Sequence, residues 1–144
     1  KMSKDTLELL KECNAGCKSA TNSMEQVQAY VKDSQLRKII EQYNKEHILI
    51  GDECHKILDK AGETEKDPSP MAKTFSWIST EIKMMINDDE KKIADIMVDG
   101  CNMGIKALSR YLNEYKEADK ESRNLTKKLI RLEQDFMNDL LGYL

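Results

Sequence analysis

The chain has 144 residues, of which 40% are hydrophobic and 34% charged, and its formal net charge is −3. This length suits a single domain over residues 1–144, and the composition excludes disordered and collagen-like chains. The slight acidic excess argues against a nucleic-acid partner, and no apolar run is long enough for a membrane span. Residues 2–5 lead straight into a helical pattern without an export signal, so we expect a cytoplasmic protein.

Apolar residues recur at three- and four-residue spacing in four long segments, which predicts four amphipathic helices. Asp5, Asp33-Ser34, Asn87-Asp88-Asp89 and Ser122 are the expected helix starts, and Gly62 is the expected end of the second helix. The apolar stripes are Leu10, Cys13, Cys17, Ala20, Met24, Val27 and Val31; Leu36, Ile40, Tyr43, His47, Ile50, Cys54, Ile57 and Ala61; Ala94, Met97 or Val98, Cys101, Ile105, Leu108, Leu112 and Tyr115; and Leu125, Leu129, Leu132, Phe136, Leu140 and Tyr143. No segment alternates with period two, so we predict no sheet.

The long connection between the second and third helices determines the predicted topology. Pro68 and Pro70, the only prolines, lie in it, and a shorter helix is expected at about residues 71–86. Antiparallel neighbours need only about 2–8 residues of connection, whereas this one is long enough to cross the bundle. We therefore predict an all-α four-helix bundle of two helical hairpins, joined by a helix-containing crossover that makes the second and third helices parallel.

An internal repeat accompanies this plan. The segment 13–18 recurs at 101–106 as Cys-Asn-x-Gly-x-Lys, an offset of 88 residues, and the second helix aligns with the last at an offset of 89. We interpret the chain as two hairpins of one plan. The alternative is that any two amphipathic helices align this well.

This pattern resembles the ferritin-like superfamily, and most of all its small bacterial families of unknown function. The resemblance implies a di-iron centre with one carboxylate on each of two helices and Glu-x-x-His on each of the other two. In this sequence the corresponding slots are Thr21, Asn44, His47, Ser109, Glu133 and Phe136, so His47 and Glu133 alone match. Two iron ions need several anionic oxygens, so we expect a degenerate site with no iron pair, no cofactor and no ferroxidase or oxygenase activity.

Other arrangements remain open for these residues. A shifted register would use Glu46, Glu53, Asp99 and Glu114, although these lie off the apolar stripes and should face solvent. His47 itself lies on a stripe. We expect it to be a core histidine bonded to Glu133 or Thr21, with metal ligation as the alternative.

The four cysteines have two interpretations. Cys13, Cys17 and Cys54 should cluster at one end of the core, and Cys101 should lie at the opposite end. Free cysteines are commonly small buried apolar residues, and no Cys-x-x-Cys is present. The alternative is a thiol site for Cu(I) or zinc, or a redox site. A reducing cytoplasm disfavours a disulfide.

No sequence motif indicates an enzyme: a nucleophile elbow, a phosphate loop and a dinucleotide fingerprint are all missing. The leading hypothesis is a non-enzymatic bundle that acts through protein association, with a stress role by analogy. Trp77 and Met84 on the crossover helix would mediate a homodimer or bind another protein partner. The rival hypothesis is a metal-binding or redox protein that uses Cys13, Cys17, Cys54 and His47.

Overall fold

The computed structural model describes residues 2–63 and 90–144. These residues form four long helices and a terminal 3-10 turn, with no strand among them, which confirms the prediction of helices for this part of the chain. The elements are α1 (Lys4–Gln28), α2 (Ser34–Lys60), α5 (Glu90–Glu114), α6 (Lys120–Leu140) and η1 (Leu141–Tyr143). The helix predicted at residues 71–86, with Trp77 and Met84, and the start predicted at Asn87-Asp88-Asp89 lie outside the described residues.

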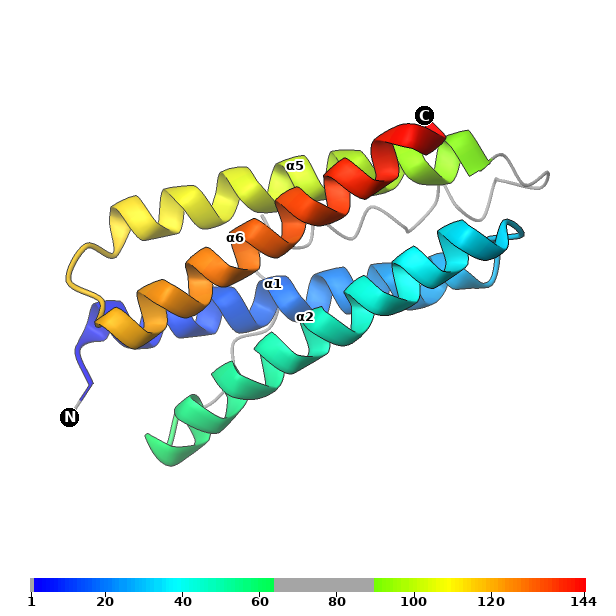
Figure 1. The fold of residues 1–144 in the computed structure, drawn as a ribbon. Coiled ribbons are helices and arrows are strands. Elements are labelled where there is room, and N and C mark those ends of the chain that lie inside the picture. The colour runs from blue at the N-terminus through cyan, green and yellow to red at the C-terminus, as the bar shows by residue number, and fades with distance from the viewer. Residues whose placement is uncertain (1, 64–89) are drawn as a thin grey trace.

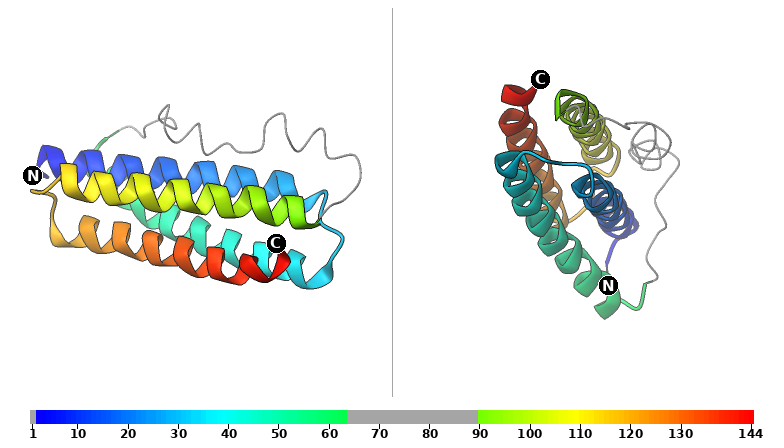
Figure 2. Two further views of the ribbon diagram at one scale, coloured as in Figure 1. Left: turned by 90° about the horizontal axis from the view of Figure 1, so that it is seen from above. Right: turned by 90° about the vertical axis from the view of Figure 1, so that its right-hand side faces the viewer.

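The four helices form a bundle of two antiparallel hairpins (Figure 1). Seen end-on in Figure 2, α1 and α6 lie at opposite corners, and so do α2 and α5. Figure 1 also shows that α2 ends near the end of the bundle where α1 begins, whereas α5 begins at the other end. The helices α2 and α5 therefore run in the same direction, which a long connection between them permits.

Two helix starts differ from those predicted. The cap of α1 is Ser3, whose hydroxyl accepts a hydrogen bond from the Thr6 N–H at 3.2 Å, and Asp5 lies in the first turn. The cap of α6 is Asp119, whose carboxylate accepts from the Ser122 N–H at 2.8 Å. Ser122 thus lies three residues past the cap, because an acidic cap was available earlier in the loop. The predicted start of α2 is correct.

The two turns of the bundle are held by carboxylates from the opposite hairpin. Asp5 on α1 accepts a hydrogen bond from the Glu117 N–H, in the turn between α5 and α6, at 2.9 Å. Glu90 on α5 accepts from the Lys32 and Asp33 N–H groups, in the turn between α1 and α2, at 2.9 and 3.3 Å. Backbone amides that have no helical partner are satisfied in this way.

The core follows the predicted stripe of α1 and departs from the others in places: Ile105, Leu112, Tyr115, Leu132 and Tyr143 are only partly buried. Every predicted stripe residue of α1 is buried. In α2, Leu58 is fully buried and Ala61 is exposed, because the helical period after Cys54 turns Leu58 inward. Gly62, with a φ of +70°, follows the helix as predicted, in a conformation that favours glycine.

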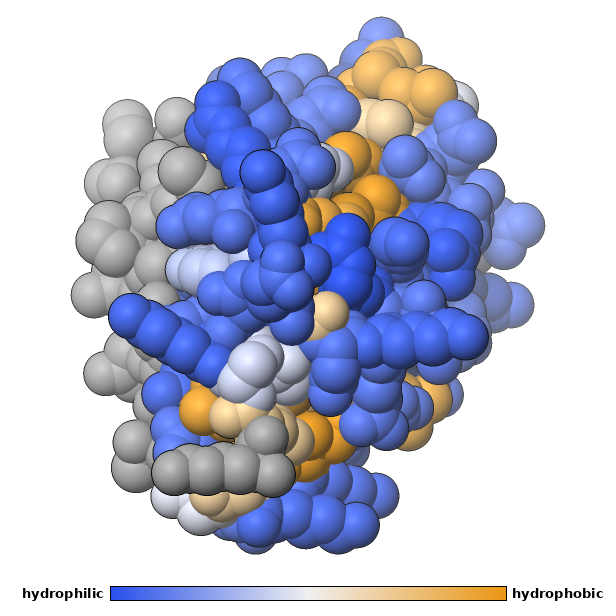
Figure 3. Space-filling model, turned by 90° about the vertical axis from the view of Figure 1, so that its left-hand side faces the viewer, coloured by the Kyte–Doolittle hydropathy of each residue, from blue (hydrophilic) through white to orange (hydrophobic). Residues whose placement is uncertain are grey.

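The end of the bundle where α1 begins is mostly polar. Figure 3 shows the end of the bundle where α1 begins, and charged and polar side chains cover most of it between separate apolar areas. No helix in residues 2–63 and 90–144 combines the length and apolar composition needed to cross a membrane.

Candidate functional site

A buried histidine and a buried glutamate meet between α2 and α6. His47 is 0% exposed and Glu133 is 6% exposed. The His47 Nε2 lies 2.7 Å from Glu133 Oε2, and His47 Nδ1 lies 2.6 Å from the Tyr43 carbonyl oxygen. Of the six positions of the expected iron centre, only those of His47 and Glu133 hold a residue of the expected type. The structure pairs these two side chains with each other.

The partners of the imidazole define its charge state. A carbonyl oxygen and a carboxylate both accept hydrogen bonds, so this setting favours an imidazolium whose two nitrogens both donate. Burial lowers the pKa of His47, but the charge and hydrogen bond of Glu133 and the Tyr43 carbonyl outweigh it and raise the pKa above its ordinary value. The pair is therefore neutral as a unit, and neither charge lacks a partner.

Phe136 fills the place where a second histidine would stand in the ferritin-like pattern. Its ring is fully buried, stacks on Tyr43 at a centroid distance of 4.7 Å and meets His47 edge-on at 6.4 Å. The Tyr43 hydroxyl donates to Asp139 at 2.6 Å, and burial together with this bond raises the pKa of Tyr43. Aromatic side chains therefore occupy the position at which the ferritin-like pattern has a second histidine.

The remaining three slots supply no carboxylate. Thr21 donates to the Lys18 carbonyl at 3.1 Å, and Ser109 donates to the Ile105 carbonyl at 2.7 Å, so both hydroxyls bond their own helices. The Asn44 amide is directed toward Glu25 at 3.5 Å, near the surface. The six slots therefore bring together one carboxylate and one imidazole, which do not fit the charge requirement of two iron ions.

The acidic residues of the alternative register do not reach this centre. Glu53, Asp99 and Glu114 are exposed, and Glu46 is partly buried and accepts a hydrogen bond from Gln42 on its own helix. Among the described residues, no three His, Cys, Asp or Glu side chains are arranged to hold a metal ion.

Gly104 makes room for Glu133. A Cβ atom built on Gly104 of α5 would lie 2.6 Å from Glu133 Oε1, closer than real Cβ atoms approach. The corresponding residue of the predicted repeat, Gly16 on α1, would place its Cβ no closer than 3.9 Å to any neighbour. A side chain at position 104 would therefore oblige the Glu133 carboxylate to move, whereas one at position 16 would meet only ordinary contacts.

The structure brings Cys13, Cys17 and Cys54 into one core cluster and places Cys101 in the other. Interactions with the Cys17 and Cys54 thiols lower the pKa of Cys13 well below its ordinary value, against the effect of burial. Interaction with Cys13 and burial raise the pKa of Cys17 and Cys54, and burial raises the pKa of Cys101. None of the four forms a disulfide.

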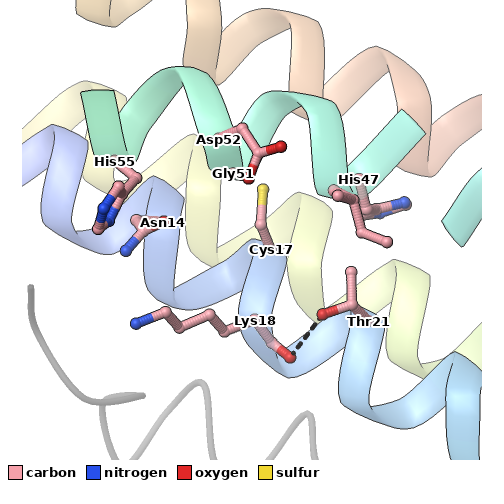
Figure 4. Close-up of a pocket in the computed structure, with 9 residues that line it drawn as sticks. Asn14, Cys17, Lys18, Thr21, His47, Gly51, Asp52 and His55 are labelled. Carbon is pink, nitrogen blue, oxygen red and sulfur yellow. Dashed lines mark hydrogen bonds between the residues drawn. The ribbon is translucent and has the colours of Figure 1, made fainter. Parts of the chain in front are cut away.

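A groove of about 300 Å³ lies between α1 and α2 beside these groups. Figure 4 shows its residues, with the Cys17 sulfur pointing from α1 toward Gly51 of α2. Thr21 and His47 line the groove farther along, and His55 lies at its other end. The groove therefore connects the edge of the thiol cluster with the edge of the ion pair.

Sequence reasoning missed the residues that shape these sites. Gly51 lets α2 approach α1, since a Cβ there would lie 3.2 Å from the Cys17 Cβ. Gly51 and Gly104 both stand inside helical patterns, and an interior glycine is the signal that points to close approach. Asn14, which is 2% exposed and lines the groove, carried no such signal.

Comparison with known proteins supports the fold alone. No protein-family model matches the chain, and no curated protein matches its sequence. Among solved structures, the chain is similar to a DUF305 fragment from Deinococcus radiodurans, with a TM-score of 0.72 and 10% identity over 98% of this chain and 95% of that chain. The fold and the site together define a helical bundle with a buried ion pair. At this identity the neighbour shows the all-helical fold, and membership of the ferritin-like superfamily stays a proposal.

Replacing His47 by leucine should destabilise the chain by about 3–5 kcal/mol, because Glu133 is left buried without its partner. Replacing both residues by leucine should recover most of this loss, since an apolar pair of similar volume carries no desolvation penalty. Urea unfolding of the two variants measures the difference, and His55→Leu at an exposed position is the control. Equal losses in the single and double variants would contradict an ion pair.

The stability that the ion pair contributes should depend on pH, and the same variants test this. Because the folded chain raises the pKa of His47, the stabilisation is complete below the unfolded value of about 6.5 and is lost as pH rises through the folded value. The difference in unfolding free energy between the wild type and the double variant should therefore shrink as the pH rises.

Gly104→Ala should destabilise the chain although alanine favours helices by up to about 1 kcal/mol, because its methyl group displaces the Glu133 carboxylate. Gly16→Ala, the matched control, should be neutral or stabilising. In a Glu133→Ala background the cost of Gly104→Ala should disappear. Thermal unfolding measures all four variants, and a cost that persists without Glu133 would show that another contact limits Gly104.

Proposed function

We propose that this chain is a cytoplasmic ferritin-like bundle with a degenerate di-iron site, which acts non-enzymatically through association with proteins. A role in a stress response is proposed by analogy alone. The observation that carries the proposal is the centre of the bundle, where one carboxylate and one imidazole pair at 2.7 Å. The ring and hydroxyl groups of Phe136, Thr21 and Ser109 occupy slots in which an iron centre needs ligands.

The pair supports this proposal because both of its members are already satisfied. Each ring nitrogen of His47 has an acceptor, and Glu133 Oε2 accepts one of these bonds. A metal ion would have to displace a proton from the imidazole and break this contact. A single carboxylate would then have to offset several positive charges, which hard cations satisfy with several oxygen ligands.

Association is proposed from apolar residues in two parts of the chain. Trp77 and Met84, outside the described residues, are the residues that the sequence offers for a homodimer or another protein partner. Among the described residues, Ile48 and Leu49 are adjacent on α2 and are 40% and 57% exposed. Exposed apolar neighbours are more common at interaction surfaces than elsewhere, although single ones are ordinary.

Iron should remain well below one equivalent per chain when the protein is purified without chelator and then offered ferrous iron anaerobically. Elemental analysis after desalting is the measurement. Stoichiometric iron would overturn the proposal. Stoichiometric copper or zinc that is lost in Cys13→Ser would instead favour a thiol-bound metal.

A variant with the ligands restored provides the matched control for iron binding. Thr21→Glu, Asn44→Glu, Ser109→Glu and Phe136→His together would return the six side chains of the ferritin-like pattern. Iron binding by this variant, but not by the wild type, would show that missing ligands explain the difference. Folding of the variant is checked by its circular dichroism before iron is added.

Light scattering should detect a dimer whose population rises with concentration. Trp77→Ala should shift this equilibrium toward the monomer, because truncating a large aromatic anchor removes most of the binding energy of a small interface. Leu49→Ser, on the described surface, is the control. A strict monomer at every concentration would remove the homodimer from the proposal, and a shift with Leu49→Ser alone would place the interface on α2.

A further inference from the structure

The groove between α1 and α2 has the dimensions of a small ligand site. Its wall on α1 runs from Asn14 to Thr21, and its wall on α2 runs from His55 back to His47. Each wall covers two helical turns, or about 10 Å along the helix. The volume of about 300 Å³ is at the lower limit of ordinary ligand pockets, so the groove suits a small molecule rather than a peptide.

Gly51 keeps this groove open. A Cβ built on Gly51 would lie 3.2 Å from the Cys17 Cβ and 3.9 Å from the Asn14 Oδ1, so a larger residue would occupy the space that these side chains line. The predicted repeat aligns Gly51 with Leu140 of α6, whose side chain is fully buried. The second hairpin therefore fills with a side chain the position that the first hairpin leaves open.

The Asn14 amide at one end of the groove lacks an acceptor for its nitrogen. The residue is 2% exposed, and its Nδ2 has no hydrogen-bond partner. A buried donor without an acceptor is destabilising, so such a group in a folded chain calls for an explanation. The residue that the repeat aligns with Asn14 is Asn102, which is exposed. A ligand oxygen in the groove would give the Asn14 amide the acceptor that it lacks.

Two further nitrogen groups lie at the same end of the groove. Figure 4 shows the Lys18 ammonium and the His55 ring on the side where the Asn14 nitrogen lies. Lys18 and His55 take part in other interactions as well, so the amide is the group that needs a ligand. The Asp52 carboxylate lies on the side away from these nitrogens (Figure 4). This end therefore presents donors and a positive charge, which suit a carboxylate.

The other end of the groove is apolar. Cys17 and Ile48 line it, and Ile48 is 40% exposed. The Thr21 hydroxyl already donates to the Lys18 carbonyl at 3.1 Å. An apolar chain in this part of the groove would remove apolar surface of Ile48 from water, which favours binding. A small inorganic anion would leave this part unfilled.

We propose that the groove binds a small monocarboxylate. Its carboxylate lies against the Asn14 amide and the Lys18 ammonium, and its short apolar chain lies along Cys17 and Ile48. One negative charge and an apolar remainder match the two ends of the groove. This site goes beyond the proposed association function, because its ligand is a small molecule and no partner protein is required.

The experiment titrates pentanoate into the full chain, labelled with heavy nitrogen, and follows the amide signals by nuclear magnetic resonance. We expect saturable shifts of the side-chain amide of Asn14 and of the backbone amides of Cys17 and Gly51. Pentanamide lacks the charge and inorganic phosphate lacks the apolar chain, so each should bind at least tenfold more weakly. Phosphate that binds as tightly as pentanoate would show an adventitious ion only and would overturn the proposal.

Three variants connect the binding to these residues. Asn14→Ala should weaken pentanoate binding by about tenfold or more, because a hydrogen bond to a charged group is lost. Lys18→Met should also weaken it, and Asn102→Ala, the matched control, should leave it unchanged. Unchanged affinity in both groove variants, or shifts centred outside the groove, would overturn the proposal. Circular dichroism checks the fold of each variant before titration, and Lys18→Met, at a partly exposed position, keeps the test decisive if Asn14→Ala does not fold.

Discussion

The contact between His47 and Glu133 joins α2 and α6 through two buried polar groups inside the bundle. Two charged groups in a core are tolerable when each has its partners, and here the imidazole has an acceptor on both nitrogens. This requirement sets the rotation of α2 and α6 about their axes, because either helix turned by one residue would direct its charge elsewhere. It also explains why α5 carries a glycine at position 104, opposite the carboxylate.

The thiol cluster lies beside this pair. The pKa of Cys13 is lowered chiefly by Cys17 and Cys54, and the pKa of Cys17 is raised chiefly by Cys13 and burial. The charges of His47 and Glu133 add smaller effects in the same directions. Contacts among the thiols themselves therefore set their protonation more than the neighbouring ion pair does.

Much of this architecture could be predicted from the sequence because helical periodicity is a strong signal. The stripe of α1, the cap at Asp33 and the stop at Gly62 all follow from residue type and spacing. The caps at Ser3 and Asp119 were missed because several polar residues precede each helix, and hydrogen-bond geometry decides among them. The predicted stripe placed Ala61 in the core, but Leu58 is buried and Ala61 is exposed, because a strict count of three and four drifts against 3.6 residues per turn.

The candidate sites were less accessible from the sequence. Residue type indicated that His47 would be buried with a partner, but Glu133 lies 86 residues away and Thr21 was an equal candidate. The spacing of Cys13, Cys17 and Cys54 along two antiparallel helices indicated that they lie at the same height in the bundle. Their contacts depend on how closely α1 and α2 approach at Gly51, which is a property of the packed pair.

The carboxylates that hold the turns have a consequence for how the chain reaches this state. Asp5 and Glu117 are 112 residues apart, and Lys32 and Glu90 are 58 apart, so each clasp joins opposite halves of the chain. A hairpin alone would leave the amides of its own turn without these acceptors. Docking of the halves therefore completes the hydrogen bonding of both turns, which makes loop ordering dependent on contacts far apart in the sequence.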